Sequence, residues 1–274
     1  MIQHVKSADG TMLAVEPFGD GEPLIVLGGA LSTRAAIEPY VPFLGGAFTV
    51  YGVDRRGRGD SGDTAPYAVE REIEDVAAIV QAAGGSAKVY GHSSGAILAL
   101  EAAAAGVQFS GLLVYEPPFC TPQEPGESWD QFAARVRELA ETGQRDDAVE
   151  AFMRHTGAPF DPAVKQMPWW PGLTELAHTL FYDLSIVGSA DIPADRFAKI
   201  QAPVLAVYGG NSDSWAQRSA SGVASAVQNG RTELVPGYDH RVAPEALGPV
   251  LLDFFGKTAG RTAGEPASQI AEEN

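Results

Sequence analysis

A serine between two glycines is the residue of this chain whose surroundings best fit a reactive side chain. Ser93 lies at the centre of Tyr90-Gly91-His92-Ser93-Ser94-Gly95, between a short apolar strand at 88–90 and an alanine-rich helix at 96–105. When a strand turns directly into a helix, the two backbones come so close that glycine is required on both sides of the apex. The apex residue is then strained, and its side chain points out above the sheet. The spacing therefore predicts that Ser93 is an exposed nucleophile.

Ser94, the next residue, could stabilise the charge that such a nucleophile generates. Its backbone N–H would lie at a helix N-terminus, where the helix dipole favours a developing oxyanion. Gly-x-Ser-x-Gly is a short pattern in a chain with 31 glycines, and the alternative is a serine that only caps a helix. The strand before Ser93 and the helix after it favour the nucleophile, because the motif needs this context.

A serine nucleophile needs a base and an acid from other parts of the chain. Of the five histidines, His240 alone follows a predicted core strand and precedes a predicted core helix. Asp213 follows another core strand and is the predicted acid. Glu116 is the competing acid, since it lies at the carboxyl end of the strand after the serine and could also reach His240. Asp239 adjoins His240 in sequence, which is a poor geometry for supporting that ring.

Apolar runs alternate with helical stretches along most of the chain, which predicts an α/β fold with a mainly parallel, doubly wound sheet. The active site of such a sheet lies at the carboxyl ends of its strands. The predicted strands are residues 2–7, 11–18, 23–27, 48–53, 88–90, 111–115, 203–208 and 232–235. The predicted helices of this sheet are residues 35–44, 66–83, 96–105, 215–228 and 244–256.

The alternation stops between residues 119 and 200, where the sequence shows helical stretches and no convincing strand. We therefore predict a helical cap of residues 119–200 inserted into a core domain of residues 1–118 and 201–257. The polar, acidic residues 258–274 are predicted to form a disordered tail.

Two adjacent tryptophans stand out in the predicted cap. Trp169 and Trp170 are bracketed by Pro168 and Pro171, and adjacent residues of a helix cannot share one narrow face. We expect at least one of the two rings to line a pocket above Ser93. The alternative, which applies to most aromatic residues of this segment, is a place in the cap's own core.

Composition limits the partners of the protein. The formal net charge is −16, from 35 acidic and 19 basic residues, which predicts no nucleic-acid and no membrane partner. The sequence shows neither a signal peptide nor an apolar run of about 18 residues, and the single cysteine, Cys120, fits a reducing, cytoplasmic location. No histidine and carboxylate cluster has metal-ligand spacing, so no metal and no cofactor is predicted. The expected partner is a small-molecule substrate, and the oligomeric state is not predicted.

The turn Asp54-Arg55-Arg56-Gly57-Arg58-Gly59-Asp60-Ser61-Gly62 places three arginines among glycines. Such a turn could bind phosphate or nucleic acid. The net negative charge of the chain and the acids that alternate with the arginines favour a structural turn instead.

The serine in Gly-His-Ser-Ser-Gly, the later aspartate and the histidine near the C-terminus together resemble the α/β-hydrolase fold family. Gly28-Gly29-Ala30 resembles the loop that supplies the second oxyanion N–H in that family, and residues 54–61 resemble its Arg-Gly-rich turn. The resemblance covers about residues 5–118 and 200–256. The sequence departs from the family pattern at Gly28, where many members have a His-Gly pair.

The resemblance implies a triad of Ser93, Asp213 and His240, with an oxyanion hole formed by the N–H groups of Ala30 and Ser94. Asp213 is preferred to the competing glutamate because the strand before it matches the acid-bearing strand of the family. The loop that leads to it is one residue longer than the usual pattern.

The triad leads us to expect a serine hydrolase that cleaves a carboxylic ester or related acyl bond of a small, largely apolar substrate. The same residues could serve a lactonase, a thioesterase, a carbon–carbon bond hydrolase or an acyltransferase. A non-catalytic ligand-binding protein on this scaffold is the alternative from a different class. The expected pocket residues are Leu31, His92, Glu116, Trp169, Trp170 and Trp215.

Overall fold

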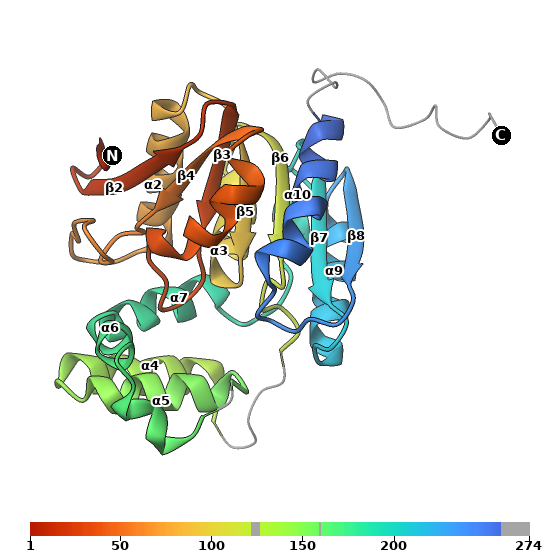
Figure 1. The fold of residues 1–274 in the computed structure, drawn as a ribbon. Coiled ribbons are helices and arrows are strands. Elements are labelled where there is room, and N and C mark those ends of the chain that lie inside the picture. Colours follow the sequence, from red (N-terminus) through yellow and green to blue (C-terminus); the bar gives the residue numbers. More distant parts are fainter. Residues whose placement is uncertain (122–126, 159, 259–274) are drawn as a thin grey trace.

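Eight strands form one sheet in the order β1-β2-β4-β3-β5-β6-β7-β8 in the computed structural model, which describes residues 1–121, 127–158 and 160–258. The β1–β2 and β2–β4 pairs are antiparallel, and all the other pairs are parallel. The mainly parallel, doubly wound sheet predicted from the sequence is thus confirmed (Figure 1). The strands are β1 (Gln3–Lys6), β2 (Met12–Phe18), β3 (Glu22–Leu27), β4 (Phe48–Val53), β5 (Ala87–His92), β6 (Phe109–Tyr115), β7 (Val204–Gly209) and β8 (Gly230–Val235).

The apolar runs of the central strands are continuous because both faces of the sheet are covered. Along β3, Leu24 and Val26 point into one apolar cluster, and Ile25 and Leu27 point into the other. The first cluster packs against α10 (Pro244–Thr258), and the second packs against α2 (Val69–Ala82), α3 (Ser94–Ala104) and α9 (Ser214–Ala226). The alternation of side chains along each strand therefore builds two cores, one on each face.

Two predicted helices differ most from the structure, while the bounds of the other three differ by one or two residues. The helix expected at 35–44 is a 3₁₀ helix, η1 (Arg34–Tyr40), followed by the short helix α1 (Val41–Leu44). The helix expected from Pro66 begins at Val69, with the acidic residues Glu70 and Glu72 in its first turn. Acidic side chains at this end are favoured by the helix dipole.

The described part of the segment between β6 and β7 contains helices and no strand. Its helix α7 packs against α2 and α3 of the core, and α4 packs against α5 and α7 (Figure 1). We call residues 119–200 the inserted segment. Its helices are α4 (Trp129–Glu141), α5 (Arg145–His155), η2 (Pro162–Gln166), α6 (Trp170–Glu175), η3 (Ala177–Thr179), α7 (Leu180–Val187) and α8 (Ala194–Phe197).

The tail predicted to be disordered falls almost entirely outside the described residues, which end at residue 258. Within the described ranges, no helix combines the length and the apolar character that a membrane crossing needs.

Candidate active site

Ser93 occupies the connection between β5 and α3, with φ 56° and ψ −125°. This positive φ confirms the strained backbone predicted for the apex residue. The two flanking glycines are required by space. A Cβ on Gly91 would lie 2.6 Å from the Cα of Ala96, and a Cβ on Gly95 would lie 2.2 Å from the carbonyl oxygen of Leu27. The strand and the helix meet as closely as the sequence pattern indicates.

The loop after β3 lies directly against this turn. A Cβ on Gly29 would be 2.8 Å from the Cβ of Ser93. The carbonyl oxygen of Gly29 accepts hydrogen bonds from Ser32 Oγ and Arg58 Nη1, both at 2.6 Å. Because a peptide unit is planar, these bonds also orient the N–H of Ala30, the other end of the same peptide. The N–H of Ser94 belongs to the first residue of α3, which has no intrahelical acceptor for it.

His240 is held by a buried carboxylate. Its Nδ1 lies 2.8 Å from Oε2 of Glu116, which is 0% exposed at the end of β6. The other carboxylate oxygen, Oε1, accepts hydrogen bonds from the N–H of Gly209 and from Ser212 Oγ. Burial by itself would raise the pKa of Glu116, but the hydrogen bonds from His240, Ser212 and Gly209 lower it below its usual value. Glu116 is therefore an ionised partner for the imidazole at neutral pH.

The expectation that Asp213 supports His240 needs correction, because the structure places Glu116 there. Asp213 is exposed at the N-terminus of α9. The loop after β7 reaches the carboxylate with Ser212 instead, which donates its hydroxyl to Glu116. The structure thus brings together His240, the predicted base, and Glu116, the competing acid. Asp213, the preferred acid, does not join them.

His92 and Tyr115 support the loop that carries His240. Nε2 of His92 is 2.9 Å from the carbonyl oxygen of His240, and the hydroxyl of Tyr115 donates to the carbonyl oxygen of Asp239 at 2.6 Å. Burial, together with the nearby His240, lowers the pKa of His92 to about 4. A neutral imidazole with its proton on Nε2 can donate to that carbonyl. His92 therefore holds the His240 backbone, a role that the sequence analysis did not assign to it.

The carboxylate of Asp239 accepts the N–H of Arg241, two residues away along the chain. The carboxylate of Asp239 thus binds a neighbouring backbone group, which agrees with the expectation that Asp239 does not support the ring of His240.

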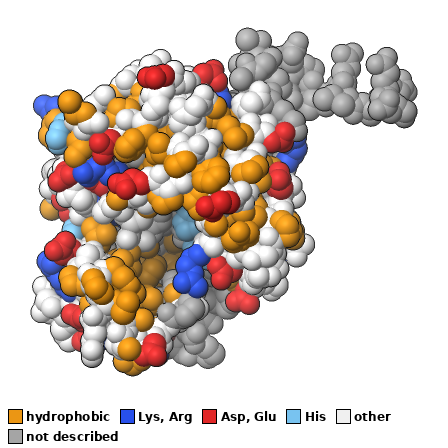
Figure 2. Space-filling model, viewed as in Figure 1, with side chains coloured by type: hydrophobic (Ala, Val, Ile, Leu, Met, Phe, Trp, Pro, Cys, Tyr) orange, Lys and Arg blue, Asp and Glu red, His pale blue; other side chains and the backbone are white. Residues whose placement is uncertain are grey.

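The three tryptophans of the predicted pocket lie in different surroundings. The ring of Trp215 is 6.1 Å from that of His240. Trp170 is 3% exposed, and its Nε1 donates to Asp146 of α5 at 2.6 Å. Its ring therefore belongs to the packing of the inserted segment, which was the alternative interpretation. Trp169 is 47% exposed, and a place for it in the pocket stays a prediction. Figure 2 shows a recess between the inserted helices and the sheet, with hydrophobic and histidine side chains visible in it.

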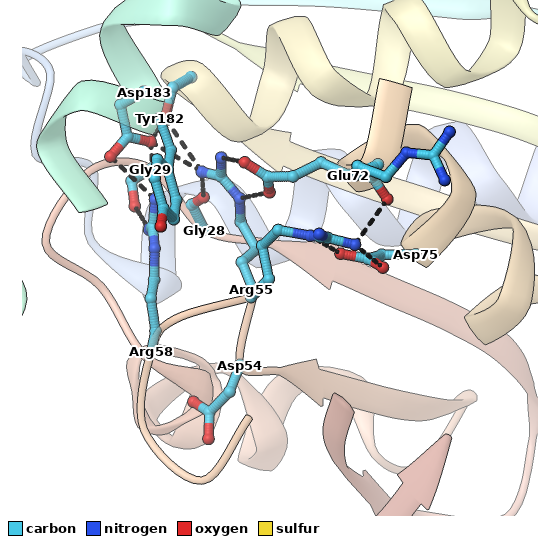
Figure 3. Close-up of polar contacts among 12 residues, drawn as sticks. Gly28, Gly29, Asp54, Arg55, Arg58, Glu72, Asp75, Tyr182 and Asp183 are labelled. Atoms are coloured by element: carbon cyan, nitrogen blue, oxygen red, sulfur yellow. Dashed lines mark hydrogen bonds and ion pairs between the residues drawn. The ribbon is translucent and has the colours of Figure 1, made fainter. Parts of the chain in front are cut away.

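The arginines of the turn after β4 form ion pairs, but with other partners than the acids beside them. Arg55 pairs with Glu72 of α2 through both carboxylate oxygens at 2.8 Å. Arg58 pairs with both oxygens of Asp183 on α7, also at 2.8 Å. These four side chains are nearly fully buried, and Figure 3 shows them pointing toward one another. The structural role predicted for the turn agrees with this arrangement.

Asp183 was not among the residues predicted from the sequence. Besides Arg58, its Oδ1 accepts Nη1 of Arg55 at 2.8 Å and the hydroxyl of Ser94 at 2.6 Å. Burial alone would raise the pKa of Asp183, but the charges of Arg58 and Arg55 hold it below its usual value. The signal that the sequence offers is a single acidic residue within a mostly apolar helix, Leu180–Val187.

In the part of the chain that the structure describes, no three His, Cys, Asp or Glu side chains are grouped as a metal site would require.

A strained serine at a strand–helix turn, with a histidine–carboxylate pair at the same edge of a parallel sheet, defines the α/β-hydrolase class. The model of the alpha/beta hydrolase family matches residues 24–248. The chain belongs to this family.

Several solved structures are similar to the chain. An alpha/beta hydrolase from Sphaerobacter thermophilus is 46% identical, with a TM-score of 0.85 over 92% of this chain and 100% of that one. A hydrolase from Pseudomonas aeruginosa is 21% identical, with a TM-score of 0.75 over 93% and 98% of the two chains. An esterase from Exiguobacterium antarcticum is 18% identical, with a TM-score of 0.73 over 95% and 100%. These last two show the shared fold alone. Comparison with curated proteins finds no match.

Proposed function

We propose that this hydrolase is a serine hydrolase that cleaves a carboxylic ester, or a related acyl bond, of a small and largely apolar substrate. The observation that carries the proposal is the 2.8 Å contact of His240 Nδ1 with buried Glu116, beside the strained turn of Ser93. Nδ1 bound to a carboxylate leaves Nε2 free to accept a proton. This is the arrangement by which a histidine activates a serine hydroxyl.

In the proposed reaction, Ser93 Oγ attacks the acyl carbon while His240 Nε2 takes its proton. Glu116 keeps the imidazole oriented and stabilises its charged form. The N–H groups of Ala30 and Ser94 stabilise the tetrahedral oxyanion. His240 then returns the proton to the leaving alcohol, and water releases the acyl group from Ser93 by the same steps in reverse order.

An apolar substrate is supported by the hydrophobic side chains visible in the recess between the inserted segment and the sheet (Figure 2). An esterase among the structures that share the fold supports testing esters first. Lactones, thioesters and other acyl compounds are attacked by the same chemistry, so they belong in the same panel of substrates. A cytoplasmic location and the absence of nucleic-acid and membrane partners also remain proposals.

A fluorophosphonate probe and a panel of esters, lactones and thioesters test this function. We expect the probe to label Ser93 stoichiometrically. Ser93→Ala and His240→Ala should each lower kcat by about 10⁴–10⁶-fold, and the double variant should be little worse, since the two residues act as one unit. His4→Ala, at an exposed position of β1, is the control and should leave kcat unchanged. A wild-type chain that neither reacts with the probe nor turns over any member of the panel would indicate a ligand-binding protein instead.

A further inference from the structure

Four buried charged side chains join the inserted segment to the turn that carries Ser93. Arg55, Arg58, Glu72 and Asp183 are 4%, 1%, 2% and 2% exposed, and they balance two positive charges with two negative ones. Figure 3 shows Glu72 and Asp183 on opposite sides of the Arg55 guanidinium, with Arg58 reaching Asp183 from below. Each carboxylate accepts at least two charge-assisted hydrogen bonds, which fixes its position.

Asp183 is the member of this cluster connected to both proposed oxyanion donors. On one side, its Oδ1 accepts the hydroxyl of Ser94 at 2.6 Å, and Ser94 carries one of the donor N–H groups. On the other side, both its oxygens hold Nη2 of Arg58 at 2.8 Å, and Nη1 of Arg58 donates to the carbonyl oxygen of Gly29 at 2.6 Å. That carbonyl belongs to the same planar peptide as the N–H of Ala30.

A charged donor on the oxygen of a peptide also strengthens the N–H at its other end, because hydrogen bonds in a chain polarise one another. Arg58 therefore both orients the Ala30 N–H and makes it a better donor. Asp183 in turn holds the guanidinium that does this.

We propose that Asp183, through Arg58 and Ser94, is a positioning residue that sets the geometry of both N–H donors of the oxyanion hole from a helix of the inserted segment. The inference rests on the proposed function, because the donors matter only if a tetrahedral oxyanion forms. It deepens that function by giving the inserted segment a part in transition-state stabilisation. Catalytic groups must be held within about 0.5 Å of their productive positions, and the rate is sensitive to each oxyanion donor.

The chain offers a matched control in the same turn. Arg56 pairs with Asp75 through two hydrogen bonds of 2.7 Å, and Asp75 is also buried. The remaining contacts of Arg56 are to Asp9 and to the carbonyl oxygen of Arg71, which lie outside the oxyanion loop. Asp75→Asn therefore removes the same charge from an equivalent buried pair without touching either donor.

The test compares Asp183→Asn with Asp75→Asn in kcat, KM, Tm and the affinity for a trifluoromethyl ketone inhibitor. Ser93 Oγ adds to the carbon of this ketone, its proton passes to His240, and the ketone oxygen becomes an anion in the oxyanion hole. We expect Asp183→Asn to lower kcat by about 10–100-fold with KM changed less than about 3-fold, as for partial loss of an oxyanion donor. Its affinity for the ketone should fall by a similar factor. Asp75→Asn should lower Tm comparably and change kcat by less than about 3-fold.

A second variant, Ser94→Ala, decides the question if Asp183→Asn does not fold. It removes the hydroxyl that donates to Asp183 and accepts a hydrogen bond from Arg55 Nη1, keeps the backbone N–H, and places a good helix former in α3. We expect it to lower kcat and ketone affinity together by about 3–10-fold with KM unchanged.

The inference is overturned if the wild type turns over an ester and neither variant lowers kcat or ketone affinity beyond the Asp75→Asn control. A wild type that neither reacts with the fluorophosphonate nor turns over any ester, lactone or thioester of the panel overturns the proposed function and this inference together. The behaviour of the wild-type protein therefore distinguishes a failure of the proposed function from a failure of this inference.

Discussion

Three residues of the candidate site, Leu31, Ser93 and Glu116, have a positive φ although none is glycine. Their φ angles are 57°, 56° and 45°, and each residue follows a parallel strand of the sheet. Such conformations cost about 1–3 kcal/mol each and persist only where the surrounding structure imposes them. At this scale, the site consists of strand ends that bend sharply to point side chains across the same edge of the sheet.

Glu116 and Asp213 give a direct comparison of the two candidate acids. We expect Glu116→Gln to lower kcat by about 10²–10⁴-fold, because a neutral amide of the same shape cannot stabilise the imidazolium of His240. Asp213→Asn should change kcat by less than about 3-fold, since Asp213 is exposed at the start of α9. The measurement is kcat on the best ester of the panel. A large loss of kcat in Asp213→Asn, without one in Glu116→Gln, would show that Asp213 is the acid of the triad.

At the scale of the elements, the active edge depends on how closely α3 approaches the sheet. The position of Gly95 is in contact with β3 and the loop after it, where a Cβ would lie 2.2 Å from the carbonyl oxygen of Leu27 and 2.6 Å from that of Gly28. Both atoms belong to backbone that cannot yield without moving the central strand or the oxyanion loop. This close approach is the physical reason for the second glycine of the motif.

Gly95→Ala should therefore lower the free energy of unfolding by at least about 2 kcal/mol, as expected for overpacking against rigid backbone. Gly172→Ala is the matched control, because Gly172 also lies in a helix and a Cβ there would meet nothing within 4 Å. Alanine is the better helix former by about 1 kcal/mol, so this control should be neutral or stabilising. Denaturant unfolding of the two variants measures the difference. Equal effects would mean that the elbow can relax around a methyl group.

At the scale of the whole molecule, the inserted segment lies against the core through α7 and α8, while α4, α5 and α6 pack on one another beyond them (Figure 1). Trp170 belongs to that packing, through its hydrogen bond to Asp146 and its ring contact with Phe160 at 6.2 Å. Trp169, by contrast, is 47% exposed, and its ring lies 6.2 Å from that of Trp170. We therefore predict that Trp169 contributes to substrate binding and that Trp170 contributes to the stability of the inserted segment.

Trp169→Ala should weaken kcat/KM for bulky apolar esters by about 1–3 kcal/mol and leave small acetyl esters nearly unchanged, if the ring contacts the acyl group. Trp170→Ala should instead destabilise the inserted segment, at a cost of about 3–5 kcal/mol for the lost ring, and affect both kinds of ester alike. Steady-state kinetics on paired long and short esters, with Tm measured in parallel, separate these effects. Equal losses on both esters for Trp169→Ala would assign that ring to packing as well.

Local patterns along the chain were enough to predict the strands and helices of the sheet and two of the site residues. Continuous apolar runs between turn residues indicate buried strands of a covered sheet, and the spacing of Gly91 and Gly95 around Ser93, between a strand and a helix, indicates a tight strand–helix turn. His240 followed by elimination, because the other histidines do not lie between a core strand and a core helix. These conclusions depend on local patterns, in which a residue and its neighbours in sequence carry the information.

The acid of the triad could not be chosen without the three-dimensional arrangement of the strand ends. Several parallel strands end at the same edge of the sheet, so a carboxylate after β6 and one after β7 were both compatible with the sequence. The path of the loop after β7 brings Ser212, and not Asp213, to the edge, and this path depends on contacts with Glu116 itself.

Local sequence patterns likewise could not predict the role of Asp183. It is 89 residues from Ser94 and 125 from Arg58 along the chain, and a lone acid in an apolar helix does not reveal its partners. Only the packing of α7 against α3 brings these charges together, because a buried carboxylate is stable where arginines and hydroxyl groups from distant segments converge on it.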